Sequence, residues 1–418
     1  MNRFTTLVIF LLSSLVSTAQ NVRTDVTVIG ASPAGISAAV QAARSGVKSL
    51  ILEGGQSLNP QFTQNDLLYL ERIRDHYYYK DQADSLTKDS LKRPLIRLEE
   101  SSRVAKSITD TVKNLTVMLN STIRKIEKDG KGWEIKLTNG RSIKTDVVID
   151  ASKDQILASM LKIEPRKTII QIENWTTNPK STPRLFRTSV GQGVIRNNEQ
   201  VTSYLIPAGS LMPVGIENIF LVPTSSTSLY PEAMLAGQAA GASAAFCAYF
   251  KTTSKNLNVR IVQGELLAYD SRLIPYKDIA FNDRHAIALQ HIGLSGVLKA
   301  KTVPALKKEE LVFDTLGTVS SEELRLPMRE FYSRSQIWFP NHKKDSMTIE
   351  DTINLLQFTA TRGEELRREI EKGWKSSFKF SSTYDPKRAI NRRELAVLID
   401  SYLQPFNIRV DLNGNLLN

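Results

Sequence analysis

The residues that could do chemistry begin close to the amino terminus, in a short run rich in glycine. Residues 25–29 are mostly β-branched and predict a strand, and Gly30-Ala-Ser-Pro-Ala-Gly35 and a helix-forming run follow directly. Gly30 permits a tight turn, and Pro33 suits the first position of a helix because it has no N–H. Gly35 lets the helix lie close to the sheet. Strand, glycine turn and helix therefore stand in the order of a nucleotide-binding unit.

A carboxylate completes this unit. Residues 47–52 predict a second strand, and Glu53 follows it, 23 positions after Gly30. In an adenine dinucleotide site a glutamate at this point accepts hydrogen bonds from the ribose hydroxyls, and the diphosphate lies at the helix amino terminus. The spacing predicts such a site, with an ordinary β-α-β unit as the alternative.

The next segments predict a β-meander and a further buried strand. Strand-like runs cover residues 115–119, 121–126 and 133–137, with turn signals at Asp129-Gly130 and Asn139-Gly140.

A further buried strand is predicted over residues 146–150, and it ends in Asp150-Ala-Ser152.

These motifs resemble the FAD-dependent oxidoreductases of the glutathione-reductase-like class. Within that class they are most similar to the exported bacterial group labelled FAD-dependent oxidoreductase or xanthan-lyase-like, which often carries G-G-T-P-A-G where this chain has residues 30–35. Residues 150–152 are similar to the family's D-A-S/T-G, with Lys153 in place of the glycine. Residues 204–213, 218–222 and 234–241 are similar to its closing signature, which ends in a helix beginning G-Q-A-A-G.

The resemblance implies FAD as the cofactor. It also implies that the amino terminus of the alanine-rich helix faces the flavin pyrimidine. Together with the spacing above, it predicts these cofactor-binding residues: Gly30, Ala31, Ser32, Pro33, Ala34, Gly35, Glu53, Ile123, Asp150, Ala151, Ser152, Gly237 and Gln238. The sequence does not identify catalytic residues, although Tyr204, Tyr230 and Glu232 lie in the segment expected to border the ring.

The predicted fold class is α/β: a Rossmann-like FAD-binding domain with a β-meander, plus a mainly α-helical carboxy-terminal domain. We expect a signal peptide over residues 1–19, the FAD-binding domain over 20–269 with a short substrate insertion at 153–203, and the helical domain over 270–418.

The amino terminus predicts export. Arg3 precedes an apolar run from Leu7 to Val16 that is too short to span a bilayer, and Ser17 and Ala19 suit a cleavage site that leaves Gln20 first. No later stretch predicts a transmembrane helix. The mature protein is expected in the periplasm or outside the cell.

Composition excludes several other classes of protein. One cysteine, Cys247, rules out a disulfide framework within the chain, and the four histidines lack metal-ligand spacing, so no metal site is predicted. The net charge of +12 is scattered among acidic residues, which favours a cationic surface over nucleic-acid binding. No G-x-S-x-G motif is present, so hydrolysis has no visible nucleophile.

The carboxy-terminal region predicts helices that begin with capping residues. Ser320, Thr348 and Asn391 each stand three positions before an acidic residue and an apolar run. A helical bundle packed on the flavin domain is one interpretation. The other is a polysaccharide or surface contact, since the pieces resemble the short repeats of S-layer-homology modules.

We therefore expect an exported FAD-dependent oxidoreductase that transfers a hydride from a small-molecule or carbohydrate substrate to flavin. The alternatives are a non-catalytic surface or glycan-binding protein on a degenerate flavin fold and, from the family label alone, a carbohydrate lyase. Substrate, electron acceptor and oligomeric state do not follow from the sequence.

Overall fold

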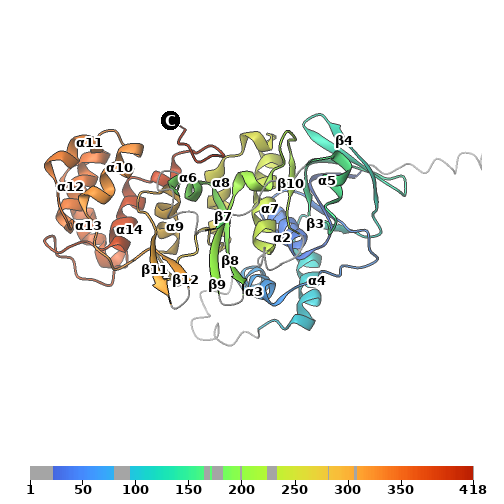
Figure 1. Ribbon diagram of the computed structural model, residues 1–418, viewed down its shortest axis with the longest axis horizontal. Coiled ribbons are helices and arrows are strands. Elements are labelled where there is room, and N and C mark those ends of the chain that lie inside the picture. Colours follow the sequence, from blue (N-terminus) through green and yellow to red (C-terminus); the bar gives the residue numbers. More distant parts are fainter. Residues whose placement is uncertain are drawn as a thin grey trace, which may run out of the picture.

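The computed structural model describes residues 22–79, 95–163, 170–171, 182–197, 200–223, 233–280, 282–305 and 308–417. The molecule is elongated, with a large sheet at one end and a group of helices at the other (Figure 1). The predicted signal peptide lies outside the described residues.

A parallel sheet forms the centre of the amino-terminal half. Its strands follow the spatial order β3, β2, β1, β6, β10, and each neighbouring pair runs parallel. Their bounds are β1 (Val22–Ile29), β2 (Ser49–Leu52), β3 (Leu115–Met118), β6 (Ser142–Asp150) and β10 (Ile219–Leu221). The predicted Rossmann-like core is confirmed.

The predicted β-meander is also present. Strands β4 (Ile123–Asp129) and β5 (Gly132–Leu137) pair antiparallel, and β5 continues the sheet along the first half of β6. The second half of β6 pairs with β10 instead. Gly130 and Gly140 occupy the two turns with φ of +60° and +86°, a region that favours glycine.

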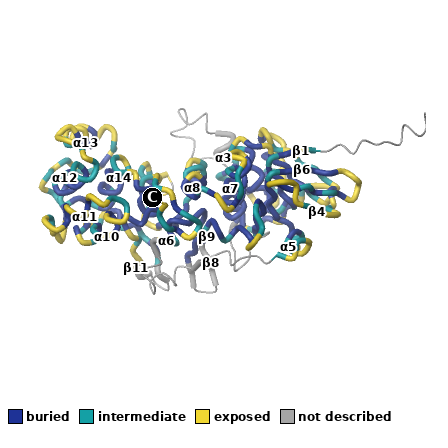
Figure 2. Tube along the Cα trace, turned by 90° about the horizontal axis from the view of Figure 1, so that it is seen from above, coloured by how far each residue is buried: buried dark blue, intermediate teal, exposed yellow. Residues whose placement is uncertain are grey.

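The sheet is covered on both faces. On one face Val28 and Ile149 pack in the same buried cluster as the helices α2 (Pro33–Arg44) and α7 (Ala233–Tyr249). On the other face Leu50 and Val148 pack with Trp133 of the meander. Neighbouring residues of a strand point to opposite faces, which explains this division. Figure 2 shows the resulting buried interior.

Further helices and a second sheet surround this core. The second sheet is antiparallel with the order β7, β9, β8, and the predicted insertion at 153–203 supplies most of it. The elements are α3 (Gln64–Tyr79), α4 (Ser101–Thr111), α5 (Ile156–Leu161), β7 (Ile170–Gln171), α6 (Thr182–Thr188), β8 (Ser189–Asn197), β9 (Gln200–Pro207) and α8 (Val259–Ala268).

The carboxy-terminal region is mainly helical, as predicted, and contains one β-hairpin that was not predicted. Its elements are α9 (Ala286–Ser295), β11 (Lys301–Ala305), β12 (Lys308–Val312), α10 (Ser321–Phe331), α11 (Ser335–Trp338), α12 (Ile349–Ala360), α13 (Glu364–Ser376) and α14 (Arg392–Tyr402). Leu266 and Leu294 belong to one buried cluster, so the core continues past residue 269. The domain bounds stay predictions. Of the helices described, none is both long and apolar enough to cross a bilayer.

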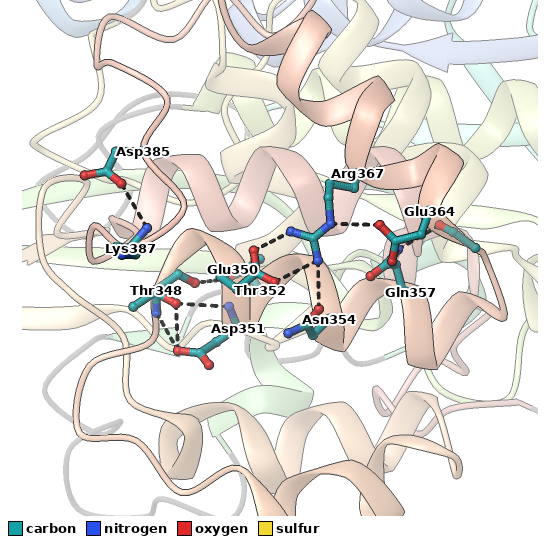
Figure 3. A network of polar contacts seen from close by, with 11 residues as sticks. Thr348, Glu350, Asp351, Thr352, Asn354, Gln357, Glu364, Arg367, Asp385 and Lys387 are labelled. Atoms are coloured by element: carbon teal, nitrogen blue, oxygen red, sulfur yellow. Dashed lines mark hydrogen bonds and ion pairs between the residues drawn. The ribbon is translucent and has the colours of Figure 1, made fainter.

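The three predicted helix caps are confirmed. Ser320 Oγ accepts the amide hydrogen of Glu323 over 3.1 Å, and Thr348 and Asn391 each form a reciprocal capping box with the acidic residue three positions later. Such a cap satisfies amides that have no partner inside the helix. Figure 3 shows the Thr348 box and Arg367 of α13, which ties α13 to α12 through Glu350 and Asn354.

Candidate cofactor site

The turn between β1 and α2 is the centre of the candidate site. Ser32 caps α2, and its Oγ accepts the amide hydrogen of Gly35 over 3.2 Å. Pro33 is the first helical residue, as predicted. Gly30 has φ of +91°, and a Cβ there would lie 2.8 Å from Ala151 O and from the Ser152 Cα. Only glycine lets the turn approach the end of β6 this closely.

Gly35 keeps the first turn of α2 against the same loop. A Cβ at this position would lie 2.2 Å from the carbonyl oxygen of Gly30 and 3.1 Å from the Ala151 Cβ. The prediction that Gly35 allows a close approach is therefore confirmed, and the neighbours involved are the glycine turn and the residue that follows β6.

The capping role of Ser32 gives a first prediction. Ser32→Ala should lower the free energy of unfolding by about 1 kcal/mol, whereas Ser32→Gly should cost only a few tenths, because glycine is a tolerated cap and alanine is not. Urea unfolding of both variants without added cofactor measures the difference. Equal stability of Ser32→Ala and the parent protein would contradict this role of the hydroxyl.

Glu53 joins the glycine turn to the loop after β2. Its Oε2 accepts the amide hydrogen of Ala31 over 2.8 Å, and its Oε1 accepts that of Gly55 over 2.9 Å. Each carboxylate oxygen has a further lone pair, so the group can still accept hydrogen bonds from a ligand. The protein thus fixes the orientation of the carboxylate in advance.

These elements border a cavity of about 790 Å³ at the carboxyl ends of the central strands. A site at this edge is typical of open α/β sheets. The predicted residues that line the cavity are Gly30, Ala31, Ser32, Pro33, Glu53, Ile123, Ala151 and Ser152.

Polar residues that the sequence analysis did not name also line the cavity: Gln56, Ser57, Asn59, Gln61, Ser121, Thr122 and Lys153. Most come from loops after β2 and before β4, which have no periodicity to indicate a ligand. Gln56, Ser57, Asn59 and Gln61 follow Glu53 closely in the sequence, and this position is the signal that could have indicated their role in the site.

Asp150 was predicted to contact the cofactor, but the structure gives its carboxylate a different task. The side chain is fully buried, and its oxygens accept hydrogen bonds from the Ser152 amide, the Ser152 hydroxyl and the Leu157 amide. Burial raises the pKa of Asp150, and these hydrogen bonds act in the opposite direction. Asp150 does not line the cavity and instead fixes the loop that leads into α5.

Gly237 and Gln238 of α7 also lie away from the cavity. A Cβ at Gly237 would lie 2.1 Å from the Ala34 carbonyl oxygen, and one at Gly241 would lie 2.3 Å from that of Ala38. Neither Gly237 nor Gln238 is among the residues that line this cavity, so their contact with the cofactor stays a prediction. Gly237 lets the backbones of α2 and α7 come into contact. Ala34 lies on the α2 side of this contact and does not line the cavity either.

Gln238 is held by other buried polar groups. Its Nε2 donates to Gln41 Oε1 over 2.9 Å, and its Oε1 accepts from Ser271 Oγ over 3.1 Å. A buried amide with both ends satisfied in this way contributes to helix packing.

The two helices run parallel, because the contacts advance together from Ala34 to Ala38 and from Gly237 to Gly241. Their amino termini therefore lie at the same end of the pair, as they must if the glycine turn and the alanine-rich helix are to meet one cofactor. Tyr204 is buried in β9. Tyr230 and Glu232, which precede α7, lie outside the described residues.

The cysteine and the metal-ligating side chains complete the survey of the described residues. Burial raises the pKa of the Cys247 thiol to about 12. Across the described ranges, no cluster of three or more histidine, cysteine, aspartate or glutamate side chains could hold a metal ion.

Comparison with known proteins identifies the ligand. Residues 25–167, from β1 to just beyond α5, match the family model "FAD dependent oxidoreductase". The cofactor is FAD. The matched segment contains the whole glycine turn, Glu53 and the loop after β6. No curated protein matches the chain.

Several solved flavoproteins are similar to parts of the chain at low identity. A flavoprotein/dehydrogenase from Cytophaga hutchinsonii is 15% identical over 66% of this chain and 85% of that chain, with a TM-score of 0.30. A mutant of the halogenase PltM in complex with FAD is 14% identical over 66% and 80%, with a TM-score of 0.33. NikD, an unusual amino acid oxidase essential for nikkomycin biosynthesis, is 15% identical over 36% of this chain, with a TM-score of 0.26, and the match covers 57% of NikD.

The residues present fit the adenosine diphosphate half of FAD. The cavity volume lies in the range of small-molecule sites, roughly 300–1,000 Å³. Gly30 leaves its turn free of any side chain, and α2 has no acidic residue in its first turn to repel a phosphate. Within the described part of the chain, the amides of Ser32 and Ala34 donate to no acceptor, so they are available to an anion.

Proposed function

We propose that this protein is an exported oxidoreductase that uses FAD to take a hydride from a small-molecule or carbohydrate substrate. One observation carries the proposal: the cavity that fits an adenine dinucleotide is built from the segment that matches the FAD dependent oxidoreductase family. The predicted signal peptide supports export, and the low identity to solved flavoproteins leaves the substrate class as part of the proposal.

The residues of the chain have separate tasks in this scheme. Glu53 orients the ribose, and the amino terminus of α2 stabilises the negative charge of the diphosphate. Because α7 runs parallel to α2, its amino terminus emerges beside the diphosphate and can stabilise negative charge on the flavin side of the cofactor. Bound flavin supplies the redox chemistry, since it accepts a hydride and passes the electrons to an acceptor.

A visible absorbance spectrum and anaerobic reduction test the proposal in sequence. The purified protein, alone or after incubation with FAD and removal of excess, should show the two visible bands of oxidised flavin. Addition of an electron donor under anaerobic conditions should bleach the longer-wavelength band. We expect one or more donors from a panel of amino acids, hydroxy acids, polyols and oligosaccharides to do so faster than buffer alone.

Three results would contradict the proposed function. A protein that takes up no FAD would exclude the cofactor role of the cavity. A protein that holds FAD but is reduced by no donor, while binding glycans, would instead favour the non-catalytic surface protein. Release of an unsaturated sugar, detected by its ultraviolet absorbance, would favour the lyase.

A further inference from the structure

We propose that Lys153 is a diphosphate-binding residue, whose ammonium group neutralises the phosphates of the bound cofactor. The inference rests on the proposed function, because it concerns the same cavity. It adds a contact by which this chain departs from the family it resembles, since the resembled motif has a glycine at this position.

The position of Lys153 carries the first part of the argument. Lys153 lines the cavity and follows Ala151 and Ser152, whose backbones lie against the Gly30 turn. The Asp150 carboxylate holds this loop in place, because it accepts hydrogen bonds from the amide and the hydroxyl of Ser152. The lysine side chain therefore starts from a rigid segment beside the amino terminus of α2.

The charges of the cavity carry the second part. Among the described residues that line it, Glu53 is the only carboxylate and Lys153 is the only cation. Glu53 accepts hydrogen bonds from Ala31 of the glycine turn and from Gly55 of the loop after β2, so its carboxylate is already held by backbone amides. Lys153 is exposed and forms no ion pair or hydrogen bond with any other residue that the structure describes.

A free ammonium group and a helix amino terminus complement each other. The α2 terminus offers amides and a partial positive charge, but no side-chain cation, to the negatively charged diphosphate. Lysine acts on phosphate as a mobile point charge and can reach the ligand from the edge of the cavity. We infer that the two groups share the diphosphate between them.

Isothermal titration with ADP and with adenosine tests this inference, because only ADP carries the diphosphate. Lys153→Gln should weaken ADP binding about tenfold and leave adenosine binding unchanged, and Lys153→Arg should keep most of the ADP affinity. The loss should shrink as salt is raised, because exposed charges are screened. Lys113→Gln, an exposed lysine outside the cavity, is the matched control and should change neither affinity.

The outcomes separate the inference from the proposed function. Equal ADP affinity of Lys153→Gln and the parent protein would overturn the inference while FAD binding stands. Equal weakening of ADP and adenosine would also overturn it, because the lysine would then act through the loop. Failure of the parent protein to bind FAD and ADP would overturn both. Thermal unfolding of each variant confirms that the exposed substitution leaves the fold intact.

Discussion

Gly237→Val should destabilise the protein by about 3 kcal/mol or more, the largest stability effect that we expect from one substitution in the amino-terminal half. The added Cβ would lie 2.1 Å from the carbonyl oxygen of Ala34 and 2.8 Å from its carbonyl carbon. The atoms that it meets belong to the backbone of another buried helix, so no side chain can rotate away, and overpacking of this kind forces the helices apart. The variant should also bind FAD weakly, because α2 carries the glycine turn.

Gly264→Ala is the matched control, since it adds a methyl group to a helical glycine with open space around it. This change should stabilise the protein by about 0.5–1 kcal/mol, as alanine is the better helix former. Chemical unfolding of the two variants against the parent protein measures both effects. A Gly237→Val protein as stable as its parent would show that α2 and α7 do not pack as described.

Glu53→Gln should weaken FAD binding about 30-fold, which corresponds to about 2 kcal/mol. The two carboxylate oxygens already accept the amides of Ala31 and Gly55, and the remaining lone pairs can accept ribose hydroxyls. Glutamine replaces one of these oxygens by an NH₂ group. This group would face a backbone N–H, so two hydrogen-bond donors would meet and one hydrogen bond would be lost. The charge that strengthens the hydrogen bonds to the ribose is also lost.

Fluorescence quenching of FAD on titration with protein measures this loss. Glu99→Gln removes a carboxylate from an exposed site away from the cavity, where Glu99 forms an ion pair with Arg97, and should leave FAD affinity unchanged. If Glu53→Gln bound FAD within about twofold of the parent protein, the ribose could not be held by this side chain.

The local part of the site was predictable because short-range physics determines it. Strand, turn and helix over residues 25–53 follow from β-branched residues, a glycine that must adopt positive φ, and a proline at a helix start. The caps at Ser320, Thr348 and Asn391 are equally local, because the hydroxyl or amide oxygen and its amide partners lie within one turn.

The roles of Gly237, Gln238 and Asp150 were not predictable in the same way. Fifteen of the residues of α7 are buried, so no polar face indicates which side meets the cofactor and which meets α2. That choice depends on where α2 lies, about 200 residues earlier in the chain. Asp150 was likewise predicted to contact the cofactor, and only the position of Leu157 shows that its carboxylate accepts an amide at the start of α5.

Irregular and weakly patterned segments account for the other differences. The loop after Glu53 lines the cavity through residues with no strand or helix period, and its role depends on how it folds back over the site. The hairpin of β11 and β12 contains lysine, glutamate and proline beside few apolar residues, so its sequence does not favour a strand over the helices around it.

A crystal structure of the protein grown with FAD tests the central claim most directly. We expect the adenosine ribose to lie on the Glu53 carboxylate, the diphosphate to lie over Ser32 at the start of α2, and the flavin to extend toward the amino terminus of α7. FAD bound elsewhere on the molecule, or a cavity that holds only water at saturating FAD, would contradict this account.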